Sequence, residues 1–197
     1  EVALLYKPHG TTIGHQAPDN LTIMLEGLGG RWLNGPGSFD YDRSEQGTWY
    51  KQSVARSGVV VDETSQHPQG LGTAIFASDG GRSSAGELVH FVALPSVALA
   101  TGATDRVYND VAMERTVLVT DHYVLDRYNV QSSSPRQYDW VINVSATEGD
   151  ITVPQEARSG TLGTRAGYQH ISNVRTGVTE EDWSATWIKT GGHTMRL

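Results

Sequence analysis

The chain contains no cysteine and no long apolar run, and both absences narrow what it can be. Without Cys among 197 residues, neither disulfides nor thiolate metal sites contribute. No stretch approaches the roughly 18 consecutive apolar residues of a membrane-spanning helix. Basic residues are also in deficit, because 15 Lys and Arg face 22 Asp and Glu, for a net charge of −7. This balance disfavours nucleic acid as a partner, so an anionic ligand requires a local positive patch.

Several common catalytic patterns are missing as well. The glycine-rich stretches 70–72 and 80–81 lack the Lys-Ser/Thr and strand–helix context of a phosphate loop, and we interpret them as hairpin turns. No serine lies in a nucleophile elbow, and no HExxH spacing occurs. Nucleotide binding, serine hydrolase chemistry and HExxH-type metallohydrolase chemistry are therefore disfavoured.

Short apolar or alternating runs dominate the chain, and clusters of Gly, Ser, Asn and Asp separate them. This pattern predicts an all-β, antiparallel β-sandwich. We expect residues 1–197 to form a single domain, cut from a longer protein at both ends. Only residues 95–101 and 155–158 have a composition that permits a helical turn. The predicted strands lie at 21–25, 59–61, 88–94, 116–119, 123–129, 140–144 and 183–188, and the predicted turns at 27–30, 34–38, 78–86, 131–135 and 147–150.

Polar side chains are concentrated in segment 8–21, PHGTTIGHQAPDNL, just before an apolar run. His15 has the side chain of a general acid or base, a metal ligand, or a donor to a carboxylate. The alternative is a histidine whose nitrogens satisfy nearby backbone groups. Flanking glycines permit close approach of a ligand, which favours a functional His15. His9 has a weaker claim to substrate binding, and Asn20 is a candidate both for bracing the turn and for contacting substrate.

A second polar group lies in segment 48–52, TWYKQ. A tyrosine beside a lysine suits an anionic sugar, because the ring stacks or donates while the cation pairs with a carboxylate. Tyr50 and Lys51 are therefore candidates, although an exposed strand with an ordinary aromatic–charge pair fits equally well. Arg56, just before the apolar run 58–61, either pairs with an internal acid or faces a ligand. We assign a structural role to the polar residues of 121–126 and 137–140, whereas His170 is a candidate to line a groove.

Taken in order, five blocks resemble the carboxyl-terminal β-sandwich domain of heparinase II/III-like polysaccharide lyases, a group that includes alginate and oligoalginate lyases. The resemblance covers most of the chain. The blocks are Pro8-His9-Gly10…Gly14-His15…Pro18-Asp19-Asn20-Leu21, Leu33-Asn34-Gly35-Pro36-Gly37…Tyr41, Trp49-Tyr50-Lys51-Gln52, Val59-Val60-Val61-Asp62…Ser65-Gln66 and Asp121-His122-Tyr123-Val124-Leu125-Asp126…Tyr138-Asp139-Trp140.

The resemblance implies β-elimination on a uronic-acid polysaccharide, alginate-like or glucuronate- and heparan-like. In such enzymes the principal Tyr and an Asn/His pair come from an amino-terminal α-helical toroid, the implied partner domain. The sandwich contributes the histidine that matches His15, as carboxylate neutraliser or auxiliary base, and a tyrosine near Tyr50, as a subsite contact. Lys51, Arg56, Asn20 and His9 are the expected substrate-binding residues. The implied location is periplasmic or secreted, and the 197 residues alone are expected to be inactive.

The chain departs from these relatives at a structural zinc site. Many relatives bind zinc through a second histidine, an aspartate and a further histidine, and the matching positions here are Ala17, Asn34 and Arg56. Neither Ala nor Arg is a metal ligand, and neutral Asn is a poor one for zinc. We therefore predict no metal and no other cofactor, and we expect Arg56 to supply positive charge, with Asn34 as a candidate hydrogen-bond partner. Loss of the metal also fits a non-catalytic module that binds acidic glycans.

Overall fold

The computed structural model describes residues 1–8, 16–37, 40, 43–67 and 84–197. The described part is nearly all β, with antiparallel pairing throughout, which confirms the predicted fold class. None of its short helical turns is long and apolar enough to cross a membrane.

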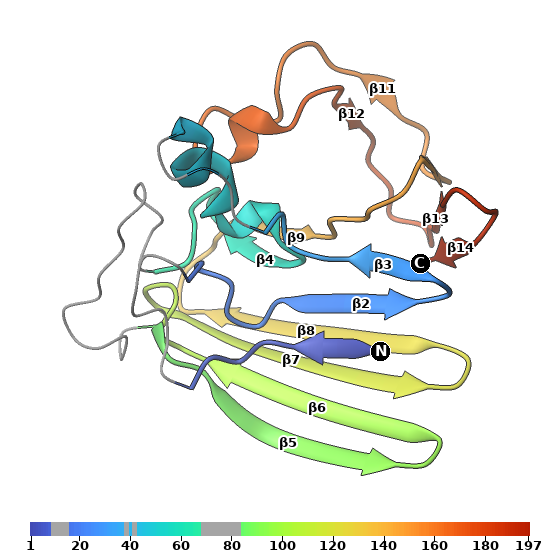
Figure 1. Ribbon diagram of the computed structural model, residues 1–197. Helices are drawn as coiled ribbons and strands as arrows, with labels where there is room; N and C mark the ends of the chain where they lie inside the picture. The colour runs from blue at the N-terminus through green and yellow to red at the C-terminus, as the bar shows by residue number, and fades with distance from the viewer. Residues whose placement is uncertain (9–15, 38–39, 41–42, 68–83) are drawn as a thin grey trace.

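One layer is a four-stranded antiparallel sheet of long strands in the order β5–β6–β7–β8 (Figure 1). Side chains of β7 alternate, and Val111, Met113, Arg115 and Val117 point into the protein. This period of two is the one that a half-buried strand requires. The strands are β5 (Glu87–Leu94), β6 (Val97–Thr104), β7 (Val111–Thr120) and β8 (Val124–Ser132).

The facing layer combines two smaller sheets, β1–β2–β3 and β4–β9. The Ile23 amide donates to the Ser57 carbonyl at 3.2 Å, and Leu33 forms a bridge with Val144, so these sheets are joined edge to edge. Buried valines of β4 and Leu21 pack against β7, and this contact forms the main core between the layers. The strands are β1 (Val2–Leu4), β2 (Ile23–Gly27), β3 (Gly30–Leu33), β4 (Gly58–Val61) and β9 (Tyr138–Val141).

The C-terminal third adds a small sheet, β10–β13–β14, and a two-stranded ribbon, β11–β12. In Figure 1, β13 and β14 lie at the right of the molecule and β11 and β12 along its top, whereas the helical turn η1 lies at the upper left. Their bounds are β10 (Glu148–Ile151), β11 (Glu156–Ala157), β12 (Arg175–Thr176), β13 (Ala185–Ile188) and β14 (Thr194–Arg196), with the turns η1 (Gln46–Tyr50), η2 (Ser53–Ala55) and η4 (Tyr168–His170).

Local expectations differ from the structure at four places. Residues 155–158, expected to permit a helical turn, contain β11, which pairs with β12. Residues 97–104, of which 97–101 were expected to permit a helical turn, form β6 in the middle of the sheet, because pairing with β5 and β7 on both sides outweighs local composition. Residues 148–150, expected in a turn, belong to β10, which pairs with β13. Segment 48–52 is not an exposed strand, because η1 ends at Tyr50 and the Lys51 amide donates to Gln46 O at 3.0 Å.

Candidate functional site

Segment 16–20, which follows His15 directly in the chain, is held in place by buried side chains of η1, η2 and their flanks. The Lys51 ammonium donates to the Gln16 carbonyl at 2.9 Å. The Ser53 hydroxyl donates to the Pro18 carbonyl at 2.6 Å. Lys51 and Ser53 are each 3% exposed. These bonds to backbone carbonyls replace the strand pairing that this irregular segment lacks.

Asp19 lies at the centre of the same region and pairs with two cations. The Arg56 Nε lies 3.2 Å from one carboxylate oxygen of Asp19, and the Lys7 ammonium contacts the other. Lys7 also donates to the Ala17 carbonyl, and Arg56 donates to the Gln52 carbonyl at 3.1 Å. We call Lys7, Lys51, Arg56 and Asp19 the cation cluster. It places three positive charges around one carboxylate in a chain whose net charge is negative.

Burial sets the electrostatics of the cation cluster. Loss of water lowers the pKa of Lys51, and the neighbouring Arg56 charge lowers it further. Burial also lowers the pKa of Arg56, and the Asp19 carboxylate opposes that shift. Charges in such a place are screened by salt far less than surface charges. The cluster therefore places positive potential around segment 16–20.

The structure answers the question that the sequence left open for Arg56. Its partner is an internal acid, Asp19, together with the Gln52 carbonyl. The expected hydrogen bond to Asn34 does not form between these two described residues, although Arg56 packs against the adjoining Gly35: a Cβ at that glycine would lie 3.3 Å from Arg56 Cγ. That expectation is wrong because Asp19 offers a charged acceptor. For Lys51 and Arg56, a direct contact with substrate stays a prediction, and in the structure each of them donates to a backbone carbonyl of the chain.

Asn20 is 2% exposed and braces two distant parts of the chain. Its backbone amide and carbonyl bond the Gln66 side chain, each at 2.8 Å, and its Nδ2 donates to the Ser84 carbonyl at 2.9 Å. This geometry favours the bracing role over the substrate contact that was also predicted. Substrate binding by Asn20 stays a prediction that its burial weighs against.

A small cavity of about 220 Å³ lies beside the cation cluster. Trp49 of η1, Asn34 after β3 and Asn143 after β9 line it. Tyr50 follows on η1 and is half-buried. The His170 ring reaches the same turn, with its Nε2 2.9 Å from the Thr48 hydroxyl. The Trp49 ring with two amides suits the face and hydroxyls of a sugar ring. Tyr50 is not among the residues that line the cavity, and its role as a subsite contact stays a prediction.

His15 and His9, the other predicted site residues, lie outside the described residues, as does Tyr41. Their roles stay predictions. The neighbouring residues that sequence reasoning missed are Lys7 and Ser53. Lys7 directly precedes the Pro8-His9 pair, whereas nothing in the local pattern marks Ser53 as a donor to a distant carbonyl.

The residues at the relatives' zinc positions do not fit a zinc ion. Ala17 has no donor atom, Asn34 offers a neutral amide, and the Arg56 guanidinium pairs with Asp19. No group of three His, Asp or Glu suited to a metal occurs in the described part of the chain, which leaves out His9 and His15.

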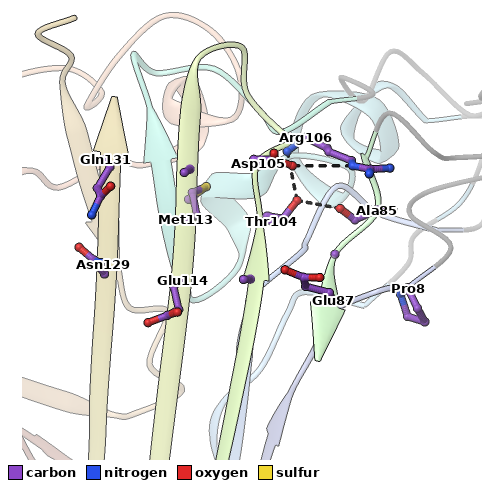
Figure 2. A pocket seen from close by; sticks show the side chains of 13 residues that line it. Pro8, Ala85, Glu87, Thr104, Asp105, Arg106, Met113, Glu114, Asn129 and Gln131 are labelled. Carbon is purple, nitrogen blue, oxygen red and sulfur yellow. Dashed lines mark hydrogen bonds and ion pairs between the residues drawn. The ribbon is translucent and has the colours of Figure 1, made fainter. Parts of the chain in front are cut away.

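A larger cavity, of about 630 Å³, opens on the outer face of the four-stranded sheet. Figure 2 shows Glu87, Glu114, Asn129 and Gln131 along it. Among the described residues that line it, Arg106 is the one basic side chain, and its Nε lies 3.7 Å from an Asp105 oxygen. A surface with three carboxylates repels an anion, so it is a poor site for an acidic glycan.

Comparison with known proteins supports the sequence resemblance. The model of the heparinase II/III-like, C-terminal family matches residues 5–196, essentially the whole chain. A comparison with curated proteins finds no match.

Proposed function

The chain belongs to the heparinase II/III-like C-terminal family, and on that premise we propose that it is the β-sandwich part of a lyase that cleaves a uronic-acid-containing polysaccharide by β-elimination. The family supports a domain of the polysaccharide lyase type. The observation that carries the proposal further is the buried cation cluster around segment 16–20, the segment that follows His15 in the sequence, in a chain that is otherwise acidic. The proposed substrate is a large acidic polymer, and the proposed location is therefore periplasmic or secreted.

The chemistry explains why positive potential matters. The proton at C5 of a uronate is adjacent to an ionised carboxylate and is a very weak acid. Neutralising that carboxylate stabilises the negative charge that develops when the proton leaves. A base takes the proton, the C4–O bond breaks, and a proton returns to the leaving oxygen. The products are an unsaturated sugar and a new chain end.

In this proposal the residues of this chain neutralise the carboxylate of the bound uronate. His15 donates to it or acts as an auxiliary base, and Lys51 and Arg56 act on it through their charge. Tyr50 contacts a neighbouring sugar. The principal Tyr and the Asn/His pair come from the toroid domain of the same protein, so the isolated 197 residues are inactive.

The test is formation of unsaturated product, followed by ultraviolet absorbance, with alginate, heparan sulfate, hyaluronan and glucuronan. The protein at its natural full length is expected to act on one of them. His15→Ala is expected to lower the rate by about 10²-fold or more, the scale of a lost acid–base group. His193→Ala, at an exposed position between β13 and β14, is the control and should leave the rate unchanged.

Two results would contradict the proposal. If His15→Ala keeps the wild-type rate and melting temperature, His15 is not in the site. If the full-length protein binds a polymer but forms no product from any of the four, the non-catalytic glycan-binding alternative is favoured instead.

A further inference from the structure

A second cleft, of about 1170 Å³, lies between the β10–β13 sheet and the β11–β12 ribbon. In Figure 1, β13 and β14 lie at the right of the molecule, β11 and β12 along its top, and η1 at the upper left. None of the residues that line the cleft belongs to the cation cluster.

Two tryptophans form one wall of the cleft. Trp183, Ala185 and Trp187 are spaced two residues apart and all line it, as expected for one face of an extended segment. Extended chain places the two tryptophans roughly 13 Å apart. Trp183 is 43% exposed and Trp187 is half-buried. The wall therefore offers two aromatic surfaces with a small alanine between them.

Gly149 allows Trp187 to lie close against the neighbouring strand. The two residues are cross-strand partners in the β10–β13 pair. A Cβ at position 149 would lie 2.9 Å from Trp187 Cδ1 and 3.2 Å from its Nε1, which is too close for any side chain. The glycine thus lets the indole lie over the strand and shapes this wall of the cleft.

Polar groups along the cleft are available to a ligand. Gln155 and Arg175 line it and are exposed. Their side chains, and the indole N–H groups of Trp183 and Trp187, form no hydrogen bond or ion pair with other described residues. Aromatic surface combined with a few uncommitted polar groups is typical of a small-molecule site.

The charged residues in and near the cleft indicate which kind of ligand it can bind. Asp150 and Arg175 are the charged residues among those that line the cleft, and their charges are opposite. Three acids, Glu180, Glu181 and Asp182, immediately precede Trp183 in the chain. Such surroundings repel a polyanion. They suit a ring that carries hydroxyls and no charge.

From these contacts we propose that the cleft binds uncharged sugar rings. The apolar face of a ring stacks on Trp183, and its hydroxyls bond Gln155, Arg175 and the indole N–H groups. The site holds a neutral part of a glycan away from the proposed elimination site. This inference does not depend on lyase activity, because binding requires neither a uronate nor bond cleavage.

The test is calorimetric titration of the protein at its natural full length with cellohexaose, mannohexaose and a mannuronate hexasaccharide, with tryptophan fluorescence as a second signal. Binding is expected for a neutral oligosaccharide and to be weaker or absent for the charged one. Trp183→Ala should weaken it by about tenfold or more, the effect of a lost aromatic stacking contact. The matched control is Trp140→Ala, because Trp140 of β9 is exposed to the same extent, 42%, and lies outside the cleft.

Several outcomes would overturn the proposal: no binding of either neutral probe, equal weakening in the two variants, or tighter binding of the mannuronate hexasaccharide. Acrylamide quenching gives a further check. Because the two tryptophans are equally exposed, the loss of quenching should be similar in the two variants. If the loss in Trp183→Ala is clearly smaller than that in Trp140→Ala, another part of the protein covers Trp183 and the cleft is not a sugar site. Lyase activity is measured by unsaturated product, so failure of one proposal is distinguishable from failure of the other.

Discussion

At the scale of single residues, the main feature is a turn that buried donors hold in place. The carbonyls of Gln16, Ala17 and Pro18 each accept a hydrogen bond from a side chain. Because a buried carbonyl without a partner is costly, each donor contributes to keeping the segment after His15 in one conformation. The unfolding free energy lost when a donor is removed therefore measures how much that donor stabilises the segment.

Ser53→Ala tests how much a buried donor stabilises this segment, because the Ser53 hydroxyl forms two hydrogen bonds. The Ser53 hydroxyl donates to Pro18 O and accepts from the Gln66 amide at 2.9 Å. Removing it leaves buried groups unpaired, at a cost of about 1–3 kcal/mol for each. Urea unfolding should show the loss of unfolding free energy. On the proposed function, the full-length protein should also lose lyase activity, because segment 16–20 is held less firmly.

Ser44→Ala is the control for that variant. The Ser44 hydroxyl contacts Glu45 at 3.3 Å on the surface, where water replaces a lost bond. Its unfolding free energy should stay within about 0.5 kcal/mol of wild type. If Ser53→Ala and Ser44→Ala lose the same unfolding free energy, the hydrogen bond from Ser53 to the Pro18 carbonyl does not stabilise the fold.

At the scale of an element, the turn after β4 is stabilised from outside. Asp62 and Glu63 have φ of 52° and 49°, a left-handed conformation that is unusual for residues other than glycine. The Asp62 carboxylate accepts from Arg136 at 2.8 Å and from the Gln137 amide at 3.0 Å. The hydrogen bond from Arg136 is the main cause that lowers the pKa of Asp62 below its usual 3.8.

This pKa shift predicts how stability depends on pH. Because the pKa is lower in the folded state than in the unfolded state, Asp62 stabilises the fold above pH 3.8 and loses that effect as pH falls through the lowered folded value. Asp62→Asn keeps a residue that tolerates the left-handed region. It should therefore be less stable than wild type at neutral pH, with a difference that disappears in acid.

Thermal melting of the two proteins across this pH range measures the effect. Asp105→Asn is a suitable control, because the ion pair that Asp105 forms with a described residue is longer, 3.7 Å, and joins it to the adjacent Arg106. A stability difference between wild type and Asp62→Asn that stays constant into acid would contradict the assigned cause.

At the scale of the whole molecule, one buried arginine joins the two layers of the sandwich. Arg115 of β7 is fully buried and forms a two-point ion pair with Asp126 of β8, at 2.8 Å and 2.6 Å. Its remaining nitrogen donates to the carbonyls of Leu21 and Ser57 in the facing layer, each at 2.8 Å. These carbonyls precede β2 and β4, so Arg115 fixes the spacing between the sheet and the part of the chain that holds segment 16–20.

Arg115→Met should be strongly destabilising. It removes one partner of a buried ion pair and leaves the Asp126 charge uncompensated, at a cost of about 3–5 kcal/mol. Denaturant unfolding measures the loss. The double variant Arg115→Met, Asp126→Leu should recover much of it, because no unpaired charge remains.

Arg127→Met provides the matched comparison, since Arg127 lies next to Asp126 on β8 with an exposed side chain. Its effect should stay within about 0.5 kcal/mol. If Arg115→Met costs no more than Arg127→Met, the link between the layers does not govern stability.

Local sequence patterns were sufficient for the fold class and for most strands. The buried run 58–61 and the alternation along β7 and β8 follow from which residues are apolar, because a strand that faces a core needs a period of two. The family can also be recognised from the sequence, because the order of its short motifs is read without knowing any tertiary contact. The strand pattern and the motif order both depend on residues that are close to one another in the sequence.

Only the tertiary structure decided which charged residues are buried and with what they pair. Lys51 and Arg56 are residue types that usually lie on the surface, where they could bind a sugar acid. In the structure both are buried: Arg56 pairs with Asp19, and Lys51 donates to a carbonyl of segment 16–20. Likewise, residues 97–104 become a central strand only because β5 and β7 lie on either side. Asp19 is distant in sequence from Lys51 and Arg56, whereas β6 pairs with the strands directly before and after it in the chain. In both cases the free energy of burial and pairing exceeds the local preference of the residues.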